Sequence, residues 1–464
     1  MTNPYSPVPL HREPGAAVPP VRIVHLGLGA FHRSHQAWYT AHATDAAEWG
    51  IAAFTGRSTE IAAQLTDQDG QYTLVVRGPE GDSFEVVDSV VRAIPGTDVA
   101  AFVELAASEP VAILTLTITE GGYRLGADGR LDLTDPDVAA DVALLRRLFD
   151  AQAALPGVEY PRTAFGRVLL ALEQRRRIST PALAIVPCDN IPDNGHVVRE
   201  ALGALATATS STLAAWLDSG ISVVSTSVDR ITPRGTPEDA QLVLDATGVA
   251  DRAPVVTEPF SDWVLAGDFP SGRPAWETAG ARFVDDIAPW GARKLWMLNG
   301  AHTLLAASGP LRGHALVSEA IDDPVCRDLV TALWEEDARH LTGVEVDDYA
   351  ADLLARFRNP RIEHRLAQIA LDATTKMRVR IVPVARLERA AGRSAAGCAA
   401  AVAAWILAGH DAVETPGAAA ESRTARQVAD LDPVLGGDAA FCARVDAAVA
   451  DLTTKALLTE SETA

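Results

Sequence analysis

The sequence has 464 residues, enough for two or three domains at about 150 residues each. Its 40 Lys and Arg residues against 61 Asp and Glu residues leave a net charge of −21, which argues against a main role in binding nucleic acid or an anionic membrane. Hydrophobic residues make up 48% and charged residues 22%, so folded domains with buried cores are expected.

The N-terminal segment contains six prolines within residues 1–20 and lacks the apolar stretch of an export signal, so a flexible arm is expected there. The longest uncharged run, 17 residues between Arg393 and Asp411, is rich in alanine and falls short of the roughly 20 apolar residues of a membrane span. A buried helix is the better interpretation. Four scattered cysteines, with no CxxC pair, indicate reduced thiols and a cytoplasmic protein.

Short apolar runs predict strands through the first half of the chain. The first is Val21-Arg-Ile-Val-His-Leu26, which ends at a glycine, and others lie at 50–54, 72–76, 112–118, 182–186 and 221–225. Helical stretches over 138–154 and 165–177 separate some of them. Strands that alternate with helices favour an α/β fold, with a Rossmann-like domain whose mostly parallel sheet is covered on both faces.

Beyond about residue 289 the pattern changes to long segments rich in Ala, Leu and Arg with helical spacing. They cover 294–308, 328–340, 349–357, 396–407 and 439–457, and turns with Gly or Pro separate them. We therefore predict a boundary near 285–290, with the Rossmann-like domain over 21–287 and a mainly α-helical domain over 288–464.

A glycine-rich turn, Gly27-Leu-Gly29-Ala30-Phe31-His32, follows the first strand and opens a helix. Gly27 permits a tight turn, and Gly29 lets the backbone approach a pyrophosphate at the helix N-terminus. The third glycine of the dinucleotide-binding fingerprint is replaced by His32, so a simple strand-to-helix turn is the alternative.

Charged residues near this turn bear on the choice of cofactor. His32 and Arg33 lie in the first helical turn, where a cation would help to hold phosphate, or where polar groups merely solvate the helix start. Past the next strand, Glu60 would bind the ribose hydroxyls of NAD, whereas Arg57 would meet the 2′-phosphate of NADP. The residues alone leave NAD and NADP open.

The segment Lys294-Leu-Trp-Met-Leu-Asn299-Gly-Ala-His302 places three polar residues in an otherwise apolar helix. At about 100° per residue, His302 lies about 80° and Asn299 about 140° from Lys294, which fits one side of the helix. A buried lysine loses proton affinity, as a general base near neutral pH requires. Asn299 would donate to an oxyanion and His302 would orient the substrate. The alternative is a solvated lysine beside a satisfied core histidine.

Two further polar clusters follow predicted strands. Cys188-Asp189-Asn190 comes after the 182–186 strand, at the sheet edge where ligands bind in open α/β folds. Val228-Asp229-Arg230-Ile-Thr-Pro233 follows another strand and either contributes to binding or is an Asp–Arg pair that fixes a turn.

In their order along the chain, these motifs resemble those of the long-chain mannitol dehydrogenase family, which includes mannitol 2-dehydrogenases and fructuronate reductases. The resemblance extends over nearly the full length. Besides the segments above, it includes Leu116-Thr-Ile-Thr-Glu-Gly-Gly-Tyr123, Glu258-Pro-Phe-Ser-Asp-Trp-Val264, Gly272-Arg-Pro-Ala-Trp276 and Arg356-Phe-Arg-Asn-Pro360.

This resemblance implies metal-independent, NAD(P)-dependent oxidation of a secondary alcohol, with NAD as the expected cofactor. Lys294 would be the general base, and Asn190 and Asn299 would form an oxyanion hole. His302 would hold the reacting hydroxyl, and Asp229 would contact other substrate hydroxyls. The site would lie between the two domains.

Departures from the family pattern bear on the substrate. Polyol-oxidising relatives tend to carry arginine where this chain has Gln368, eight residues before Lys376, and the segment 359–370 is more similar to fructuronate reductases. Gln368 and Lys376 are therefore expected at the substrate. Arg378 replaces a proline of the family, and Gly291 replaces a glutamate that many relatives place three residues before the catalytic lysine.

We therefore expect an enzyme that interconverts a secondary alcohol of a sugar acid or polyol and its 2-keto form. Fructuronate reductase is the leading activity, with mannitol 2-dehydrogenase or another polyol dehydrogenase as the close alternative. A non-catalytic nucleotide or sugar sensor is more remote, because it has no need of Lys294, Asn299 and His302. The expected partner is a small molecule, with neither nucleic acid nor membrane, and the expected assembly is a monomer or weak oligomer.

Overall fold

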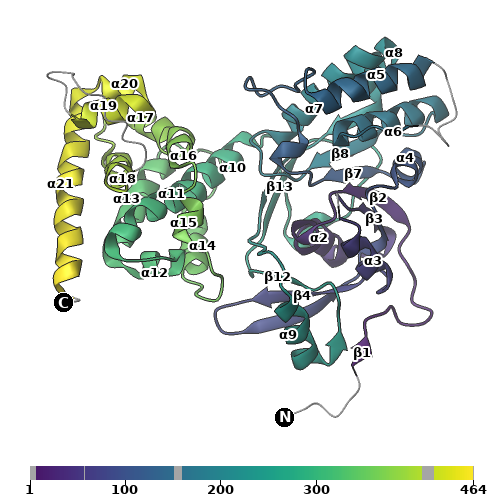
Figure 1. Ribbon diagram of the computed structural model, residues 1–464, viewed down its shortest axis with the longest axis horizontal. Helices are drawn as coiled ribbons and strands as arrows, with labels where there is room; N and C mark the ends of the chain where they lie inside the picture. The colour runs from purple at the N-terminus through teal and green to yellow at the C-terminus, as the bar shows by residue number, and fades with distance from the viewer. Residues whose placement is uncertain (1–6, 57, 151–158, 410–422, 463–464) are drawn as a thin grey trace. The chain divides into compact units, whose positions relative to one another are not determined.

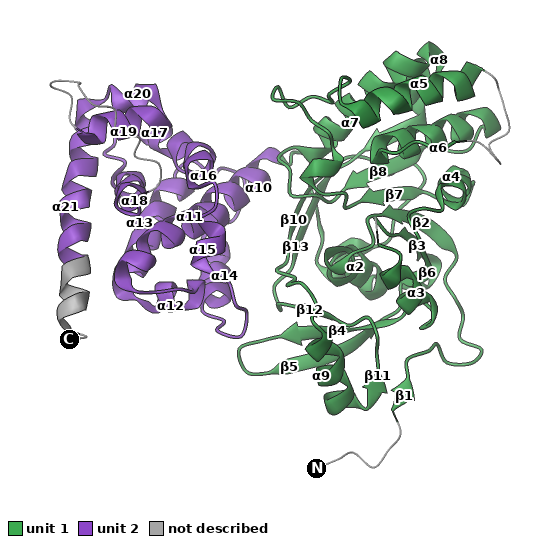
Figure 2. Ribbon diagram, in the orientation of Figure 1, with its two compact units in different colours: residues 1–287 green, residues 288–464 purple. Residues whose placement is uncertain are grey.

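The structure, a computed structural model, describes residues 7–56, 58–150, 159–409 and 423–462. It divides into two compact units, unit 1 with residues 1–287 and unit 2 with residues 288–464 (Figure 2). Arg57, which was weighed above for NADP, lies outside the described residues, and so do the last four positions of the helix predicted over 138–154.

The centre of unit 1 is a six-stranded sheet in which every neighbouring pair is parallel, in the order β6-β3-β2-β7-β8-β9 (Figure 1). Its strands are β2 (Val21–Leu26), β3 (Gly50–Phe54), β6 (Val90–Ile94), β7 (Ile113–Leu116), β8 (Leu183–Pro187) and β9 (Ile221–Val223). β3 and β8 are buried throughout, as continuous apolar runs predict for a sheet covered on both faces. The predicted Rossmann-like α/β sheet is confirmed.

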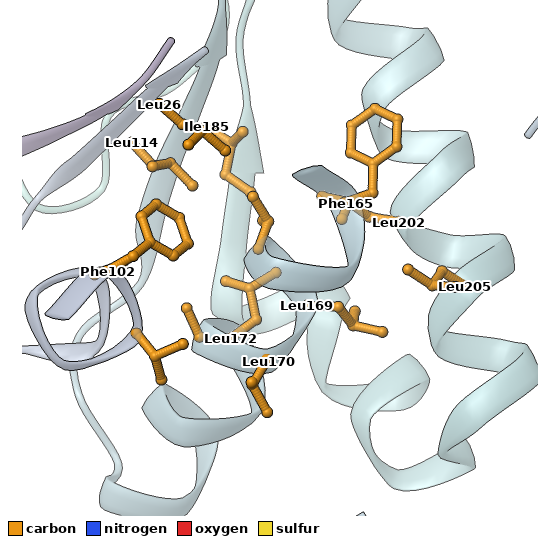
Figure 3. Packing of buried hydrophobic residues seen from close by; sticks show 14 of the residues in the cluster. Leu26, Phe102, Leu114, Phe165, Leu169, Leu170, Leu172, Ile185, Leu202 and Leu205 are labelled. Atoms are coloured by element: carbon orange, nitrogen blue, oxygen red, sulfur yellow. The ribbon is translucent and has the colours of Figure 1, made fainter. Parts of the chain in front are cut away.

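One core of unit 1 joins this sheet to a layer of helices. The helices are α4 (Val99–Ala107), α5 (Pro136–Asp150), α6 (Ala164–Ile178), α7 (Asn194–Thr209) and α8 (Ser211–Gly220). Figure 3 shows side chains of this core, among them Phe102 of α4, Leu169 of α6 and Leu202 of α7, with Leu114 and Ile185 of the sheet. Each fully buried side chain of this size contributes about 1.5–3 kcal/mol.

A second core of unit 1 includes α2 (Gln36–His42), Trp263 and Trp276. Two three-stranded sheets accompany it. β4 (Tyr72–Arg77) pairs with β5 (Asp82–Val87) and β12 (Val255–Thr257), and β13 (Asp262–Ala266) pairs with β10 (Ser225–Asp229) and β14 (Arg282–Phe283). The single strand predicted over 221–225 is therefore wrong, because the chain passes at Val224 from β9 of the parallel sheet to β10 of another sheet.

The described part of the N-terminal arm is held on unit 1. β1 (Val8–Pro9) pairs in parallel with β11 (Val249–Ala250), which follows α9 (Pro237–Thr247). Arg12 donates hydrogen bonds to the carbonyl oxygens of Asp69 and Val90, at 3.0 and 3.2 Å. Val8, Pro9 and Arg12, within the arm that was expected to be flexible, therefore have partners on unit 1 that a proline count does not reveal.

Unit 2 is mainly helical, as predicted. At its centre lies α11 (Asn299–Ser308), of which every residue after Asn299 is buried. It contacts α12 (Val317–Asp322), α13 (Pro324–Ala338), α15 (Leu366–Ile369), α16 (Ala373–Arg380) and α18 (Ala396–Leu407). α10 (Ala288–Arg293) precedes it, and α14 (Asp347–Phe357), α17 (Val382–Ala390), α19 (Arg423–Leu431), α20 (Pro433–Gly436) and α21 (Ala439–Glu462) complete the unit.

The alanine-rich run forms α18, whose residues from Gly397 to Trp405 are buried apart from Ala400. This confirms the buried helix predicted there, because small side chains let neighbouring helices approach closely. Within the described ranges, no helix combines the length and the apolar character needed to cross a membrane. The four cysteines are buried and free.

Candidate active site

The turn after β2 has the geometry that its glycines predict. Gly27 has a φ of +118°, which L side chains rarely adopt, and a Cβ there would collide with the carbonyl oxygen of Thr117. The N–H groups of Gly27 and Leu28 bond to the carbonyl oxygen of Phe54 in β3, at 2.9 and 2.8 Å. The nearest atom to a Cβ built at Gly29 is a backbone oxygen 3.6 Å away. Gly27 is thus required by the fold, whereas a Cβ at Gly29 would make only an ordinary contact, and the approach of a phosphate there stays a prediction.

His32 replaces the third glycine of the fingerprint by stacking on β2. Its ring lies on that of His25, with centroids 3.4 Å apart and planes 8° from parallel. Hydroxyl groups of Thr115 and Thr117 hold His25, at 2.8 and 3.0 Å. Burial lowers the pKa of His25 to about 3 and holds the pKa of His32 well below its ordinary value. Burial disfavours the expected cation at His32, and both of its ring nitrogens lack a hydrogen-bond partner among the described residues. The cofactor-binding role of His32 stays a prediction.

Arg33 is charged but turned into the protein. It is 6% exposed, and its guanidinium donates to the backbone carbonyl oxygens of Ala253 and Gly29, at 2.5 and 3.3 Å. These contacts tie the guanidinium to the backbone on both sides, and the role of Arg33 in holding phosphate stays a prediction. Ala30 and Phe31 are half-buried at the start of α1 (Ala30–Ser34), whose first N–H groups have no partner within the helix.

Glu60 lies near the end of β3, the strand beside β2. It is exposed and is the first residue of α3 (Glu60–Thr66). Gln64, one helical turn later, donates to its carboxylate at 3.4 Å. An exposed carboxylate at this edge of the sheet suits the hydroxyl groups of a ribose, so the NAD-binding role of Glu60 stays a prediction.

A buried carboxylate fixes the loop after β8. Asp189 is 8% exposed and accepts hydrogen bonds from the N–H groups of Ile118 and Thr119, at 3.2 and 2.8 Å. The hydroxyl of Tyr123 donates to it at 2.9 Å. Burial raises the pKa of Asp189, and these three donors oppose that rise. Since the donors follow β7, Asp189 joins the ends of two adjacent strands.

Asn190, the next residue, is exposed and lines a pocket of unit 1. The pocket has a volume of about 540 Å³, and its other polar lining residues include Glu120, Arg124 and Asp135. Arg124 pairs with Asp135 and Asp137 at 3.2 and 3.0 Å, so ion pairs hold one wall. The position of Asn190 after β8 matches the sheet edge at which a ligand was predicted.

The cluster after β10 combines a half-buried acid, Asp229, with a buried base. Arg230 is 5% exposed and donates to the carbonyl oxygens of Ser34 and Glu258, at 2.5 and 3.3 Å. Its cation lies 4.8 Å from the ring centre of Trp38. Arg230 therefore joins three segments that are distant in sequence, and Asp229 lies at the end of the strand that these contacts anchor.

The predicted helix with Lys294, Asn299 and His302 is present but is not uniformly α-helical. A single π-helical turn, η4 (Lys294–Leu298), separates α10 from α11, and the N–H of Asn299 bonds to the carbonyl oxygens of both Lys294 and Leu295. The prediction that successive residues of this segment are rotated by a constant 100° about the helix axis is therefore wrong. π-helical turns are rare and occur frequently at functional sites.

Contacts with α16 fix the start of α11. The carbonyl oxygen of Asn299 accepts from the Thr303 hydroxyl and the Arg380 guanidinium, at 2.9 and 3.2 Å, and Arg380 also donates to the Thr303 hydroxyl at 3.0 Å. Lys294 and Asn299 are half-buried, whereas the rest of α11 is buried. Lys294 and Asn299 therefore lie at the margin of the core of unit 2, where their side chains could contact a substrate.

His302 lies deeper, 8% exposed, with its ring centroid 4.8 Å from that of Phe357 and 4.6 Å from that of His364. Its Nε2 atom is buried and has no hydrogen-bond partner among the described residues. Burial lowers the pKa of His302, and the charges of His364, Arg356 and Arg380 lower it further. His302 is therefore a neutral imidazole with an unused hydrogen-bonding atom, which differs from a satisfied core histidine.

The two residues expected at the substrate have different surroundings. Gln368 is exposed on α15. The ammonium of Lys376 donates to the carbonyl oxygens of Ile369 and Leu371, at 2.9 and 2.5 Å, and so satisfies the C-terminal end of α15. The expected substrate contacts of Gln368 and Lys376 stay predictions. Arg378 is exposed and donates to the carbonyl oxygen of Asp430 at 2.7 Å.

His364 and Arg380, which adjoin His302 and Asn299, were not predicted from the sequence. Neither belongs to a short motif, and the available signal was the accumulation of basic residues after Arg356. Their proximity to α11 depends on the packing of α15 and α16 against it.

Known proteins similar to this chain span both units. A model of the mannitol dehydrogenase Rossmann domain matches residues 21–278, and one of the mannitol dehydrogenase C-terminal domain matches residues 286–425. The chain is 36% identical to a D-mannonate oxidoreductase of Escherichia coli (strain K12), over 83% of this chain and 79% of the relative. It is 34% identical to a mannitol 2-dehydrogenase of Cereibacter sphaeroides, over 82% and 80%. The solved ternary complex of Pseudomonas fluorescens mannitol 2-dehydrogenase with NAD and D-mannitol gives a TM-score of 0.74 at 30% identity, over 99% of this chain and 97% of that one.

Proposed function

Because the chain belongs to the mannitol dehydrogenase family, we propose that it is an NAD-dependent reductase of a 2-keto sugar acid, with fructuronate as the ketone and D-mannonate as the alcohol. The observation that carries the proposal is the helix through α10, η4 and α11, which holds Lys294, Asn299 and the unsatisfied Nε2 of His302 in one unit. The similarity to a D-mannonate oxidoreductase supports the sugar acid.

The turn at Gly27 and Gly29 fits a dinucleotide. A side chain at Gly27 would collide with the neighbouring strand, and the space at Gly29 is open to a pyrophosphate. The N–H groups of Ala30 and Phe31 would bond to the phosphate oxygens, and Glu60 would bind a ribose. When bound, NAD supplies the hydride acceptor, and NADH supplies the hydride donor.

The residues predicted to act on the substrate would manage its proton and bind its hydroxyl groups. In oxidation, Lys294 accepts the proton of the substrate hydroxyl, and in reduction its ammonium returns a proton to the oxygen. The side-chain amides of Asn190 and Asn299 donate to the oxygen as it gains negative charge. The neutral His302 holds the same hydroxyl through Nε2, and Asp229 takes a more distant hydroxyl of the substrate.

Initial rates of NADH oxidation with fructuronate, tagaturonate and fructose test this function. We expect fructuronate to exceed fructose by at least about tenfold in kcat/KM, which corresponds to about 1.4 kcal/mol. We expect NADH to serve better than NADPH, because Glu60 repels a 2′-phosphate. A faster reaction with fructose overturns the sugar-acid assignment.

Polyol oxidation is the second candidate. The mannitol 2-dehydrogenase from Pseudomonas fluorescens aligns with 99% of this chain, which favours a shared scaffold. A tenfold preference for fructose, together with oxidation of D-mannitol by NAD, would establish this alternative.

A further inference from the structure

The indole of Trp334 contacts the candidate catalytic helix of unit 2 at the turn that begins with Lys294. Trp334 lies on α13, is buried, and donates through Nε1 to the carbonyl oxygen of Met297 at 2.8 Å. Building on the proposed function, we propose that Trp334 is a positioning residue, which sets the placement of Lys294 relative to His302 and thereby the rate of the reaction.

The carbonyl that accepts the indole N–H belongs to the π-helical turn η4. At the end of this turn, the N–H of Asn299 bonds to the carbonyl oxygen of Lys294, five residues earlier, as well as to that of Leu295. A regular α-helix has only the bond to the residue four positions earlier, so the wider turn changes the rotation between the residues before it and those after it. Lys294 begins η4 and His302 lies in α11, so the orientation of one relative to the other depends on this turn.

A side-chain donor at this carbonyl stabilises an irregular turn. A backbone carbonyl oxygen has two lone pairs, so that of Met297 can accept the indole N–H in addition to a backbone N–H of α11. Helices deviate from regular geometry where a side chain enters their hydrogen-bond ladder. Met297 is fully buried, and a buried acceptor that loses its donor destabilises the arrangement around it. Removal of the indole N–H should therefore let the turn rearrange.

The same indole also reaches His302, through the ring of Phe357. The ring centroids of Trp334 and Phe357 lie 6.3 Å apart, and those of Phe357 and His302 lie 4.8 Å apart. Phe357 is buried and is the last residue of α14. Trp334 therefore contacts the turn that begins with Lys294 and also the ring that packs on His302, so one side chain fixes both ends of the predicted constellation.

A second buried tryptophan lies against α11 without such a hydrogen bond. Trp405 of α18 is buried and lines a small cavity together with Ala306 and Ala307 of α11. Its Nε1 atom has no hydrogen-bond partner within the part of the chain that the structure describes. Replacement of either tryptophan by phenylalanine removes the same buried volume, but only at Trp334 does it remove a donor to η4. Trp405→Phe is therefore the matched control.

Steady-state reduction of fructuronate by NADH tests the assignment in the full chain. Trp334→Phe should lower kcat by about 10- to 100-fold, because a misplacement of about 1 Å can cost about 10²-fold in rate. The Kd for NADH, which depends on unit 1, should stay within about twofold, and Trp405→Phe should keep kcat within about twofold of the wild type.

The pH profile of kcat separates positioning from a loss of folded protein. In Trp334→Phe the profile should move by at least about half a pH unit, because a displaced Lys294 has different surroundings. A smaller fraction of folded enzyme would lower kcat by the same factor at every pH and leave the profile in place. Trp405→Phe should show the wild-type profile.

Hydrogen–deuterium exchange of the backbone reports on the turn without turnover. Peptides that cover residues 294–302 should exchange at least about threefold faster in Trp334→Phe and at the wild-type rate in Trp405→Phe. If Trp334→Phe does not fold, Phe357→Leu carries the test. It keeps the indole N–H but removes the ring beside His302, so it should lower kcat several-fold, and an unchanged kcat would overturn the assignment.

Three further results would overturn the assignment: a kcat within about threefold of wild type in a folded Trp334→Phe variant, equal losses of kcat in Trp334→Phe and Trp405→Phe, or unchanged exchange of residues 294–302 in Trp334→Phe. A failure of the proposed function is distinguishable from these. A wild type that reduces fructose instead of fructuronate rejects the sugar acid, and the two variants are then compared with fructose. A wild type that reduces neither ketone rejects the function, and the exchange of residues 294–302 still shows whether Trp334 holds the turn.

Discussion

In unit 1, buried charged side chains of the motifs form hydrogen bonds with backbone groups. In unit 2, the central helix α11 buries a histidine whose Nε2 atom has no hydrogen-bond partner among the described residues. Asp189 accepts from two backbone N–H groups and a hydroxyl, and Arg33 and Arg230 donate to carbonyl oxygens. Two imidazoles of the motifs differ from these charged groups, because the Nε2 atom of His302 and both ring nitrogens of His32 are buried with no hydrogen-bond partner within the described ranges.

This comparison separates two reasons for a polar residue to be buried. Groups that join loops to strand ends have their hydrogen bonds complete within the protein, because an unsatisfied buried group destabilises the fold. A group left incomplete is costly unless a ligand completes it. Such incomplete groups occur in both units, so it is the position of His302 in the same helical segment as Lys294 and Asn299 that favours α11 as the element that contacts substrate.

The largest expected effect comes from Lys294→Ala. Loss of the proposed general base should lower kcat by about 10³-fold or more, while NADH binding, which depends on unit 1, stays within about twofold. Steady-state rates and NADH fluorescence titration measure the two quantities. Lys455→Ala, which removes a lysine paired with Asp451 on α21, should leave both unchanged. A kcat within tenfold of wild type would contradict the role of Lys294.

Asp189→Asn tests the supporting role in unit 1. An amide can accept fewer hydrogen bonds and turns its NH₂ group toward backbone donors, so we expect a loss of about 2–4 kcal/mol in the free energy of unfolding. Tyr123→Phe removes one hydrogen bond of the same carboxylate and should cost about 1 kcal/mol. Scanning calorimetry compares the melting temperatures. If Asp189→Asn melts with the wild type, the carboxylate does not hold the loop.

In unit 2, Glu388 provides a pH-dependent test of whether a buried charge with complete hydrogen bonds stabilises the fold. Burial opposes its ionisation, but hydrogen bonds from Arg339, Arg393 and His340 lower the pKa of Glu388 from 4.5 to about 2. Because the folded pKa is depressed, its contribution is complete above about pH 4.5 and is lost as the pH falls toward 2. Glu388→Gln should therefore lower stability by on the order of 2–3 kcal/mol at pH 7 and much less near pH 2. Denaturant unfolding at both pH values measures this, and an equal loss at both would contradict it.

Gly291→Glu should have the smallest effect. A Cβ at Gly291 meets no heavy atom within 4 Å, so the substitution should change stability by less than about 0.5 kcal/mol. A carboxylate three residues before Lys294 favours its protonated form, so the pH profile of D-mannonate oxidation should move upward by about half a unit. Gly291→Gln, of similar size without charge, should leave the profile in place. A downward shift would show that Lys294 does not control it.

Strands that are buried along their whole length could be predicted from the sequence. β3, predicted over 50–54, has those bounds because a parallel strand covered on both faces is apolar throughout. β5 (Asp82–Val87) escaped notice, because it mixes exposed and buried residues in a small sheet. The change of sheet at Val224 was equally hidden, since the register of strands far apart in sequence decides it.

Within the site, residue types were easier to predict than side-chain directions. Lys294, Asn299 and His302 share the predicted helix, but η4 depends on tertiary contacts such as the indole of Trp334, which donates to the carbonyl oxygen of Met297 at 2.8 Å. His32 could not be placed from its neighbours in sequence, because its stacking partner lies on the preceding strand.

The most direct measurement follows deuterium from NADH that is labelled at both positions of nicotinamide C4. With fructuronate as the acceptor, we expect one deuterium in D-mannonate, at the carbon that carried the ketone, as detected by NMR and mass spectrometry. Lys294→Ala should bind the labelled NADH and transfer almost none of its deuterium in the same time. A wild-type protein that binds NADH and substrate but transfers no deuterium would contradict the account and identify a binding protein instead of an enzyme.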